Sequence, residues 1–439
     1  MRIAAVGVIL WCDNFIWSCI TLKKIVINGG HKLTGKVNIS GAKNAASAII
    51  PAAICASGVS IIENLPLVED IACFMNILTK LGAKCEMLNE HAMRIDASSV
   101  SNIPATFECV KNIRASYYTM GALLGRFNQA EVAMPGGCDF GSRPIDLHIK
   151  GFEALGAKTQ TVGGILKMHA PNGLRGASIY LDIPSVGATI NIMLAAIRAN
   201  GQTIIENAAK EPHVVDTASF LNMLGANIKG AGTDIIRING VSQLSGAQYT
   251  IIPDQIEAGT YMIAAAATGG DVTVANVIPK HMDSLSAKLS EMNCTVIEDD
   301  DSIRVIADKP LNAVRAKAMF YPGLPTDLQP QLTALLTTAH GQSSVTESVF
   351  DNRFRYVHEL TRLNAKISVT GNTAYINGPA ELVGAEVSAT DLRAGAALII
   401  GGLCAEGKTT ISNIAHIDRG YENVVEKLCS LGADVERVG

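Results

Sequence analysis

The stretch ILTKLGAKC, residues 77–85, closes an amphipathic run with leucine, glycine and alanine, and this ending recurs along the chain. The tripeptide LGA is found four times, and the variants MNC and LNA lie between its third and last copies. The six copies begin at Leu81, Leu155, Leu224, Met292, Leu363 and Leu431, at intervals of 68 to 74 residues. Glycine and asparagine tolerate the left-handed conformation that often ends a helix. The spacing therefore predicts six helices with the same kind of C-terminal cap.

Two further features follow the same period. Ahead of five of the caps, a β-branched run that ends on a polar residue predicts a strand: VSIIEN, QTIIEN, DVTVAN, SSVTES and KTTISN. Farther ahead lie six apolar helix starts: SGAKNAAS, NIRASYY, IPSVGATI, IPDQIEAG, LPTDLQPQ and ATDLRAGA. We predict a unit of strand, helix, strand and helix that is present six times.

The chain has 439 residues, more than one hydrophobic core usually serves, which favours two domains. Three units per domain place the boundary near residue 250. The runs AASAIIPAAICA and GTYMIAAAATGG are apolar on every side, so we expect these helices inside a ring of other elements. Pseudo-threefold packing would bring three helix N-termini together in each domain, and such ends attract anions.

Composition and charge exclude several classes of protein. Apolar residues make up 48% of the chain, but their runs are interrupted, and none resembles a membrane span of about 20 residues. The net charge is −4 and the basic residues are scattered, so we expect no nucleic-acid partner. The ten cysteines form no CxxC pair. They predict reduced thiols in a cytoplasmic protein rather than disulfides or a zinc site.

Residues 1–21, MRIAAVGVILWCDNFIWSCIT, differ from the rest and contain both tryptophans, Trp11 and Trp17. Asp13 and Asn14 interrupt the apolar run that a signal peptide needs. We expect an atypical N-terminal extension, with a natural beginning near Leu22. A real targeting segment is the alternative.

The helix starts carry different residues in the two halves. Those of the first half carry Lys43, Arg114 and Ser185, and those of the second half carry Asp254, Asp327 and Asp391, the last followed by Arg393. If the domains face each other, a cationic surface would meet an acidic one, which suits an anionic substrate that loses a proton. Taken singly, the acids could equally be ordinary first-turn residues favoured by the helix dipole, and Lys43 a solvated lysine.

The run GLCAEGKT, residues 402–409, matches the phosphate-binding P-loop pattern in full. A P-loop requires a strand before the glycines and a helix after them. Here an apolar helix comes first and the β-branched run TTISN follows. We therefore interpret this motif as a structural turn.

Cys138 lies in PGGCDFGSRPIDLH, residues 135–148, where the period is interrupted. The other five units use 15 to 18 residues between the end of the strand and the cap, whereas this unit uses 21. The added residues fall around PGGC. A cysteine in a glycine-rich loop need not pack in a core, and Arg143 nearby would favour its thiolate. We predict a functional thiol rather than an apolar filler.

Six segments of the chain match the sequence pattern of a known family, in the same order: INGGHKLTGKVNISGAKNAA, PGGCDFGSRPIDLH, PSVGAT, LPTDLQ, DLRA and HIDRGYENVVEKL. From about residue 23 to its end, the chain resembles the UDP-N-acetylglucosamine 1-carboxyvinyltransferases, a family of enolpyruvyl transferases. This resemblance implies an α/β fold, a two-domain inside-out α/β barrel built from six repeats of a strand-helix-strand-helix unit, three per domain. It implies a first domain of residues 43–250 and a second of residues 22–42 plus 251–439.

The resemblance also implies an activity. The enolpyruvyl group of phosphoenolpyruvate would pass to the 3-hydroxyl of UDP-N-acetylglucosamine with release of phosphate, the first committed step of peptidoglycan precursor synthesis. It implies a role in cell wall biogenesis, cell shape and cell division. It also implies that the protein is a target of fosfomycin. Its partners would be these small molecules, with no metal or organic cofactor. The oligomeric state is left open.

Residue roles follow from the same resemblance. Cys138 would donate a proton and form a covalent adduct, and Asp327 would accept the hydroxyl proton. Lys43, Arg143 and Arg419 would supply fixed positive charge to phosphate and carboxylate oxygens. The substrate-binding positions would be Asn44, Arg114, Arg143, Pro144, Ile145, Asp146, Leu147, Ser185, Val186, Val349, Arg353, Asp391 and Arg393.

Two departures bear on nucleotide affinity. Ile183 stands where some members carry a lysine, and Gln255 where others have an arginine.

Two other functions compete with this interpretation. The shikimate-pathway enolpyruvyl transferase shares fold and donor, but its GNAGTAMR type of segment is absent. The second alternative is a non-catalytic paralogue that only binds the sugar nucleotide. Such a protein would not need every catalytic position filled, whereas all the matched catalytic positions are filled here.

Overall fold

The computed structural model describes residues 23–102, 114–133 and 145–439. The predictions on residues 1–21, on the lengthened loop with Cys138, and on Arg143 and Pro144 lie outside these ranges and stay predictions.

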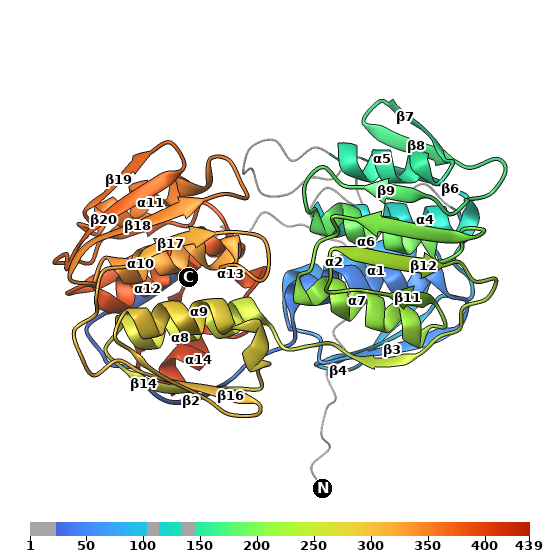
Figure 1. Ribbon diagram of the computed structural model, residues 1–439. Coiled ribbons are helices and arrows are strands. Elements are labelled where there is room, and N and C mark those ends of the chain that lie inside the picture. Colours follow the sequence, from blue (N-terminus) through green and yellow to red (C-terminus); the bar gives the residue numbers. More distant parts are fainter. Residues whose placement is uncertain (1–22, 103–113, 134–144) are drawn as a thin grey trace, which may run out of the picture.

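The chain forms two lobes, each with its own hydrophobic core (Figure 1). One cluster of buried side chains extends from Ala42 to Ile251. The other joins Ile25–Ile39 to Ile256–Val435. The predicted two-domain α/β architecture is confirmed at this level.

The first lobe contains three of the sheets formed by the described residues. Their strand orders are β13 (Gln248–Thr250), β3 (Val59–Glu63), β5 (Ala92–Asp96), β4 (Lys84–Asn89); β11 (Asn227–Lys229), β12 (Ile235–Asn239), β10 (Gln202–Glu206), β9 (Ser178–Tyr180); and β6 (Gln129–Ala133), β8 (Ile165–His169), β7 (Lys158–Val162). Strands β3 and β10 alternate between buried and more exposed residues, so one face of each sheet meets the core.

The second lobe contains three four-stranded sheets. Their orders are β21 (Glu386–Ser388), β22 (Lys408–Ser412), β1 (Lys24–Asn28), β23 (Asp434–Val438); β15 (Thr295–Glu298), β16 (Ser302–Ile306), β14 (Asp271–Ala275), β2 (Thr34–Asn38); and β17 (Arg315–Ala318), β18 (Gly341–Glu347), β20 (Thr373–Gly378), β19 (Ile367–Thr370). Strand β1 pairs antiparallel with both β22 and β23, and β2 pairs parallel with β14. The first strands of the chain thus complete sheets of the second lobe.

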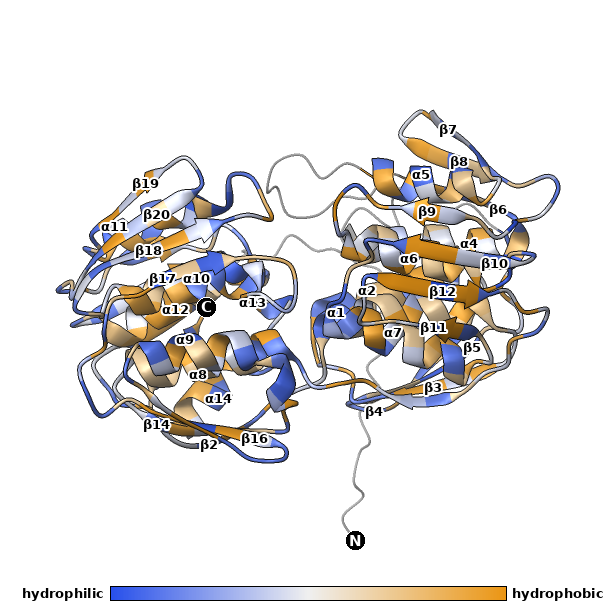
Figure 2. Ribbon diagram, viewed as in Figure 1, coloured by the Kyte–Doolittle hydropathy of each residue, from blue (hydrophilic) through white to orange (hydrophobic). Residues whose placement is uncertain are grey.

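Six largely buried helices form the centres of the lobes. They are α1 (Lys43–Ala52), α4 (Tyr118–Phe127) and α6 (Val186–Ala196) in the first lobe, and α8 (Gln255–Ala267), α10 (Gln329–Leu336) and α12 (Leu392–Cys404) in the second. Every residue of α8 from Ile256 to Ala266 is buried, which agrees with the burial predicted for the apolar run that begins at Gly259. Figure 2 shows hydrophilic residues where α1 begins beside the second lobe.

The other α-helices of the described residues lie outside this central group. They are α2 (Glu69–Lys80), α5 (Asp146–Ala154), α7 (Pro212–Met223), α9 (Asp283–Glu291), α11 (Val357–Arg362), α13 (Ala415–Asp418) and α14 (Val424–Ser430). In the described part of the chain, short 3-10 helices span Ala53–Cys55, Arg114–Tyr117, Pro279–His281, Thr326–Leu328 and Arg353–Tyr356.

The repeated caps have the conformation that the sequence predicted. The backbone φ angle is positive at all six positions, which are Gly82, Gly156, Gly225, Asn293, Asn364 and Gly432. The P-loop-like run also matches its structural interpretation, because α12 ends at Cys404 and strand β22 begins at Lys408. Helix followed by strand is the reverse of the order that a P-loop needs.

The two lobes are joined where segments 39–42 and 251–254 cross side by side. The N–H of Ala42 donates to the carbonyl of Ile252 at 2.8 Å. The N–H of Asp254 donates to the carbonyl of Ser40 at 2.9 Å, and Gly41 and Pro253 form an antiparallel bridge between these two bonds. The crossing leads directly into α1 on one side and α8 on the other, so it fixes the starts of two central helices beside each other.

Candidate active site

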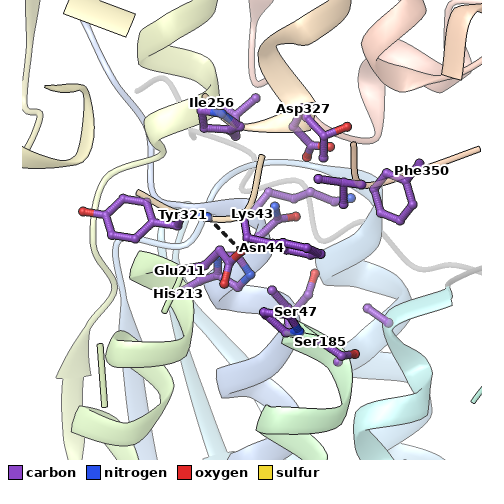
Figure 3. Close-up of a pocket in the computed structure, with 18 of the residues that line it drawn as sticks. Lys43, Asn44, Ser47, Ser185, Glu211, His213, Ile256, Tyr321, Asp327 and Phe350 are labelled. Carbon is purple, nitrogen blue, oxygen red and sulfur yellow. Dashed lines mark hydrogen bonds between the residues drawn. The ribbon is translucent and has the colours of Figure 1, made fainter. Parts of the chain in front are cut away.

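A cavity of about 660 Å³ lies between the lobes, and residues of both lobes line it (Figure 3). Helices α1, α5 and α6 present their first turns to it from one side. The segment 319–327, the start of α12 and Arg419 face it from the other. The sequence-predicted residues that line it are Lys43, Asn44, Asp146, Leu147, Ser185, Val186, Asp327, Val349, Arg353, Arg393 and Arg419.

The other predicted site residues divide into three groups. Ile145 is buried in the first core, and Asp391 caps α12 by accepting from the N–H groups of Arg393 and Ala394. Neither contributes to the cavity lining. Arg114 begins the 3-10 helix ahead of α4. Cys138, Arg143 and Pro144 lie outside the described residues.

Asp70 connects two of the predicted cations across the lobes. Its carboxylate is 2% exposed and lies in the first turn of α2. Lys43 Nζ is 3.0 Å from one oxygen, and Arg419 Nε is 3.0 Å from the other. Lys43 and Asp70 belong to the first lobe and Arg419 to the second, so this carboxylate aligns a cation from each side of the cavity.

Asp327 lies between two arginines of the second lobe. Arg393 Nη2 is 3.0 Å from Oδ2, and Arg353 Nη2 is 3.3 Å from Oδ1. Burial favours the neutral acid, but the guanidinium groups of Arg393 and Arg353 outweigh it and hold the pKa of Asp327 well below its usual range. Asp327 is therefore an ionised and weakly basic carboxylate in the free protein.

The charged residues that line the cavity contradict the acidic surface that we expected on the second half of the chain. Asp254 and Asp391 are used as N-caps, because the side chain of each accepts from two backbone N–H groups. The described second-lobe lining thus contributes three arginines against one carboxylate, Asp327. The first lobe contributes most of the acids that line the cavity, namely Asp70, Asp146, Asp182 and Glu211. Sequence position alone could not show which acids cap helices.

Glu211 and His213 were not predicted as site residues. Both line the cavity just ahead of and within the first turn of α7, and the N–H of Tyr321 approaches Glu211 Oε1 at 3.5 Å (Figure 3). Burial raises the pKa of Glu211. Burial lowers the pKa of His213 to about 4, although the carboxylates of Asp327 and Asp254 oppose this. His213 is thus a neutral imidazole near pH 7.

His148 and Tyr117 also escaped prediction. His148 is 5% exposed, lines the cavity, and packs edge-on against Tyr117 with ring centroids 5.0 Å apart. The only available signal was the position of His148, directly after the predicted Asp146 and Leu147 on α5. Among the described residues, no cluster of His, Cys, Asp and Glu could hold a metal ion, and no helix is long and apolar enough to cross a membrane.

Solved structures show the same architecture. The enolpyruvyl transferase NikO from Streptomyces tendae aligns with a TM-score of 0.85 at 27% identity, covering 95% of this chain and 99% of that one. An EPSP synthase from Acinetobacter baumannii aligns with a TM-score of 0.75 at 19% identity over 95% of this chain and all of that one. The family model for EPSP synthase (3-phosphoshikimate 1-carboxyvinyltransferase) matches residues 27–428. The fold is that of the enolpyruvyl transferases.

Curated relatives identify the branch. The UDP-N-acetylglucosamine 1-carboxyvinyltransferase 3 of Caldanaerobacter subterraneus subsp. tengcongensis is 55% identical over 417 residues, which is 95% of this chain and all of the relative. The UDP-N-acetylglucosamine 1-carboxyvinyltransferase of Clostridium botulinum is 54% identical over 418 residues with the same coverage. The chain belongs to the family of UDP-N-acetylglucosamine 1-carboxyvinyltransferases.

Proposed function

We propose that this cavity transfers the enolpyruvyl group of phosphoenolpyruvate to the 3-hydroxyl of UDP-N-acetylglucosamine and releases phosphate. The observation that carries the proposal is the convergence of Lys43, Arg393 and Arg419 from two lobes on one cavity that also holds Asp327. Phosphoenolpyruvate brings a phosphate and a carboxylate, and fixed cations stabilise both.

The reaction requires two proton transfers in its first step. The sugar oxygen bonds to C2 of phosphoenolpyruvate while its proton passes to a base, and an acid delivers a proton to C3. Loss of a C3 proton then breaks the bond between C2 and the phosphate oxygen. The products are the enolpyruvyl ether and inorganic phosphate, so atoms and charge balance without a redox partner.

Asp327 is the proposed base, and its arginines make its basicity depend on the substrate. In the free protein Arg393 and Arg353 keep the carboxylate ionised but weakly basic. An anionic substrate that draws hydrogen bonds from Arg393 weakens its hold on Asp327. The carboxylate then becomes a stronger base only when phosphoenolpyruvate is bound.

The acid remains a prediction from the sequence. Cys138, proposed as the proton donor and the site of covalent addition, lies outside the described residues. We expect Cys138→Ala to abolish turnover and Cys138→Asp to retain some, since a carboxylic acid can also deliver a proton. Mass spectrometry after incubation with UDP-N-acetylglucosamine and fosfomycin tests the thiol, and an unchanged mass would contradict its role.

Finer features of the fold belong to the same proposal. The positive φ angles of the six caps support six units in two inside-out barrels, with three units in each. The two core clusters support domain boundaries at residues 43–250 and at residues 22–42 plus 251–439. A peptidoglycan precursor enzyme of this kind would act in the cytoplasm, where its sugar nucleotide is made.

The acceptor decides between this function and its closest competitor. The matching family model is described for a shikimate-phosphate acceptor, whereas the relatives at 52 to 55% identity are described for the sugar nucleotide. We expect phosphate release from phosphoenolpyruvate with UDP-N-acetylglucosamine and none with shikimate 3-phosphate. The opposite pattern would overturn the assignment, and binding of the sugar nucleotide without turnover would indicate a non-catalytic paralogue.

The two departures bear on affinity for the nucleotide. Ile183 lines the cavity with its side chain 57% exposed, and it supplies no positive charge there. Gln255 lines the cavity at the first residue of α8. We expect Ile183→Lys to lower the KM for the sugar nucleotide without changing kcat, because a lysine at this exposed position can reach phosphate oxygens.

A further inference from the structure

We propose that Asn191 is a positioning residue, which holds the His148 imidazole in the tautomer that carries its proton on Nε2. His148 then presents a neutral N–H donor to an acceptor oxygen of the sugar nucleotide. This inference rests on the proposed function, because it names a further contact to the same substrate.

The orientation of the Asn191 amide is set by a backbone group. The N–H of Gly121, on α4, donates to Asn191 Oδ1 at 2.9 Å inside the first core. A backbone N–H can only donate, so this atom must be the amide oxygen. Helices α4 and α6 approach closely here, since a Cβ on Gly121 would lie 2.4 Å from the Asn191 carbonyl. A flipped amide would turn its NH₂ group toward the Gly121 N–H and set two donors against each other, so the hydrogen bond fixes this orientation.

The amide in turn determines the state of His148. Asn191 Nδ2 lies 2.9 Å from His148 Nδ1, in a fully buried contact. An amide NH₂ group can only donate, so Nδ1 must accept and cannot carry a proton. A neutral imidazole has one N–H, which is therefore on Nε2. Protonation of both ring nitrogens would set two donors against each other at this distance.

The donor lies beside the part of the cavity predicted to hold the sugar nucleotide. A Cβ on Gly187, the second residue of α6, would lie 3.0 Å from His148 Nε2 and 2.9 Å from the Tyr117 hydroxyl. Gly187 therefore leaves space for this nitrogen beside Ser185 and Val186. The cationic residues Arg393 and Arg419 come from the other lobe. His148 thus adds a neutral donor, which suits a carbonyl or hydroxyl oxygen better than a point charge would.

The tautomer can be tested without any ligand. We expect the ¹⁵N shifts of histidine-labelled protein to show His148 as the Nε2–H tautomer, with its signals assigned by their loss in His148→Gln. A majority Nδ1–H form would overturn the proposal. This result does not depend on turnover, so it stands apart from failure of the proposed function.

Two substitutions of His148 separate its ring nitrogens. The glutamine amide of His148→Gln can place a donor near the Nε2 position, whereas the shorter His148→Asn reaches only the Nδ1 position. We expect calorimetry to show UDP-N-acetylglucosamine bound by His148→Gln within about twofold of wild type and by His148→Asn roughly tenfold more weakly. Equal loss in both variants would contradict a donor at Nε2.

Asn191→Leu tests the positioning residue itself. Without the amide, the imidazole is free to take either tautomer, so we expect a mixed ¹⁵N signature and severalfold weaker binding of the sugar nucleotide. Asn200→Leu, at an exposed position just after α6, is the matched control. A pure Nε2–H signal with unchanged binding in Asn191→Leu would remove Asn191 from this role. Retained circular dichroism distinguishes these outcomes from unfolding.

Discussion

At the scale of single residues, the chemistry of the cavity depends on how its arginines restrain one carboxylate. Because the guanidinium groups of Arg393 and Arg353 depress the pKa of Asp327, the residue loses its charge only in strong acid. We expect Arg393→Gln to raise this pKa and to move the acid limb of kcat/KM upward by roughly one pH unit. The pH profile of kcat/KM measures the shift.

A control for this prediction is an arginine that does not line the cavity. Arg437 forms an ion pair with Asp418 through two short contacts, and its removal by Arg437→Gln deletes an arginine without touching Asp327. We expect its pH profile to match wild type. An acid limb that stays in place in Arg393→Gln would mean that another group is the base.

His213 makes stability depend on pH. Its folded pKa of about 4 lies below the ordinary value of 6.5, so the neutral ring contributes stability that is present above pH 6.5 and is lost as the pH falls toward 4. We expect the free energy of unfolding to fall by roughly 1 kcal/mol less in His213→Gln than in wild type when the pH is lowered. The effect is this small because the ring is partly exposed to the cavity. Urea unfolding at pH 7.5 and pH 4.5 measures the difference. An identical loss in both proteins would contradict it.

Local chemistry explains which residues the sequence could predict. Lys43, Asp327 and Arg393 stand at helix starts in repeated segments, and a motif identifies such positions. Asp70 could not be predicted from its surroundings, because its partner Arg419 is 349 residues away. Asp391 was predicted to bind substrate, yet it caps its own helix. An aspartate at the start of a helix can either cap that helix or bind a substrate, so the residue type alone does not distinguish the two roles.

At the scale of elements, the crossing between the lobes requires a residue without a side chain at position 41. A Cβ on Gly41 would lie 1.6 Å from the carbonyl oxygen of Asn64, whose own side chain donates to the Ile251 carbonyl. We expect Gly41→Ala to cost roughly 2 kcal/mol or more and to reduce activity, since the crossing must shift. Thermal unfolding and turnover test this together.

Gly163→Ala serves as the comparison. Gly163 has a positive φ of 58° in the turn between β7 and β8, but nothing lies within 4 Å of an added Cβ. We expect a cost of about 1 kcal/mol from the backbone alone and unchanged turnover. Equal effects of the two alanines would show that crowding at the crossing is unimportant.

Elements were predictable where the signal was local. The six caps follow from a tripeptide, and the conformation at each depends only on glycine or asparagine. Apolar runs predicted buried helices because hydrophobic patterning needs no distant information. Strand partners were different. The pairing of β1 with β22 and β23 joins the two ends of the chain, and no local pattern encodes it.

At the scale of the whole molecule, Asp70 is a link between the lobes through Arg419, and it aligns Lys43 within its own lobe. We expect Asp70→Asn to lower turnover at least tenfold, because both cations lose a charged partner in the cavity. We also expect small-angle scattering to show a more open average shape. Asp418→Asn, which removes a carboxylate bound to Arg437 within the second lobe, should change neither. Full activity in Asp70→Asn would contradict the link.

The placement of β1 between β22 and β23 also orders events during synthesis. The first core draws on one continuous stretch, Ala42 to Ile251, so it can form while later residues are still unmade. The sheet that contains β1 needs residues 434–438, and its earliest strand must wait for the last one to leave the ribosome. We expect ribosome-bound chains stopped near residue 300 to protect the first lobe from protease while residues 24–38 are cut. Early protection of that N-terminal segment would contradict this order.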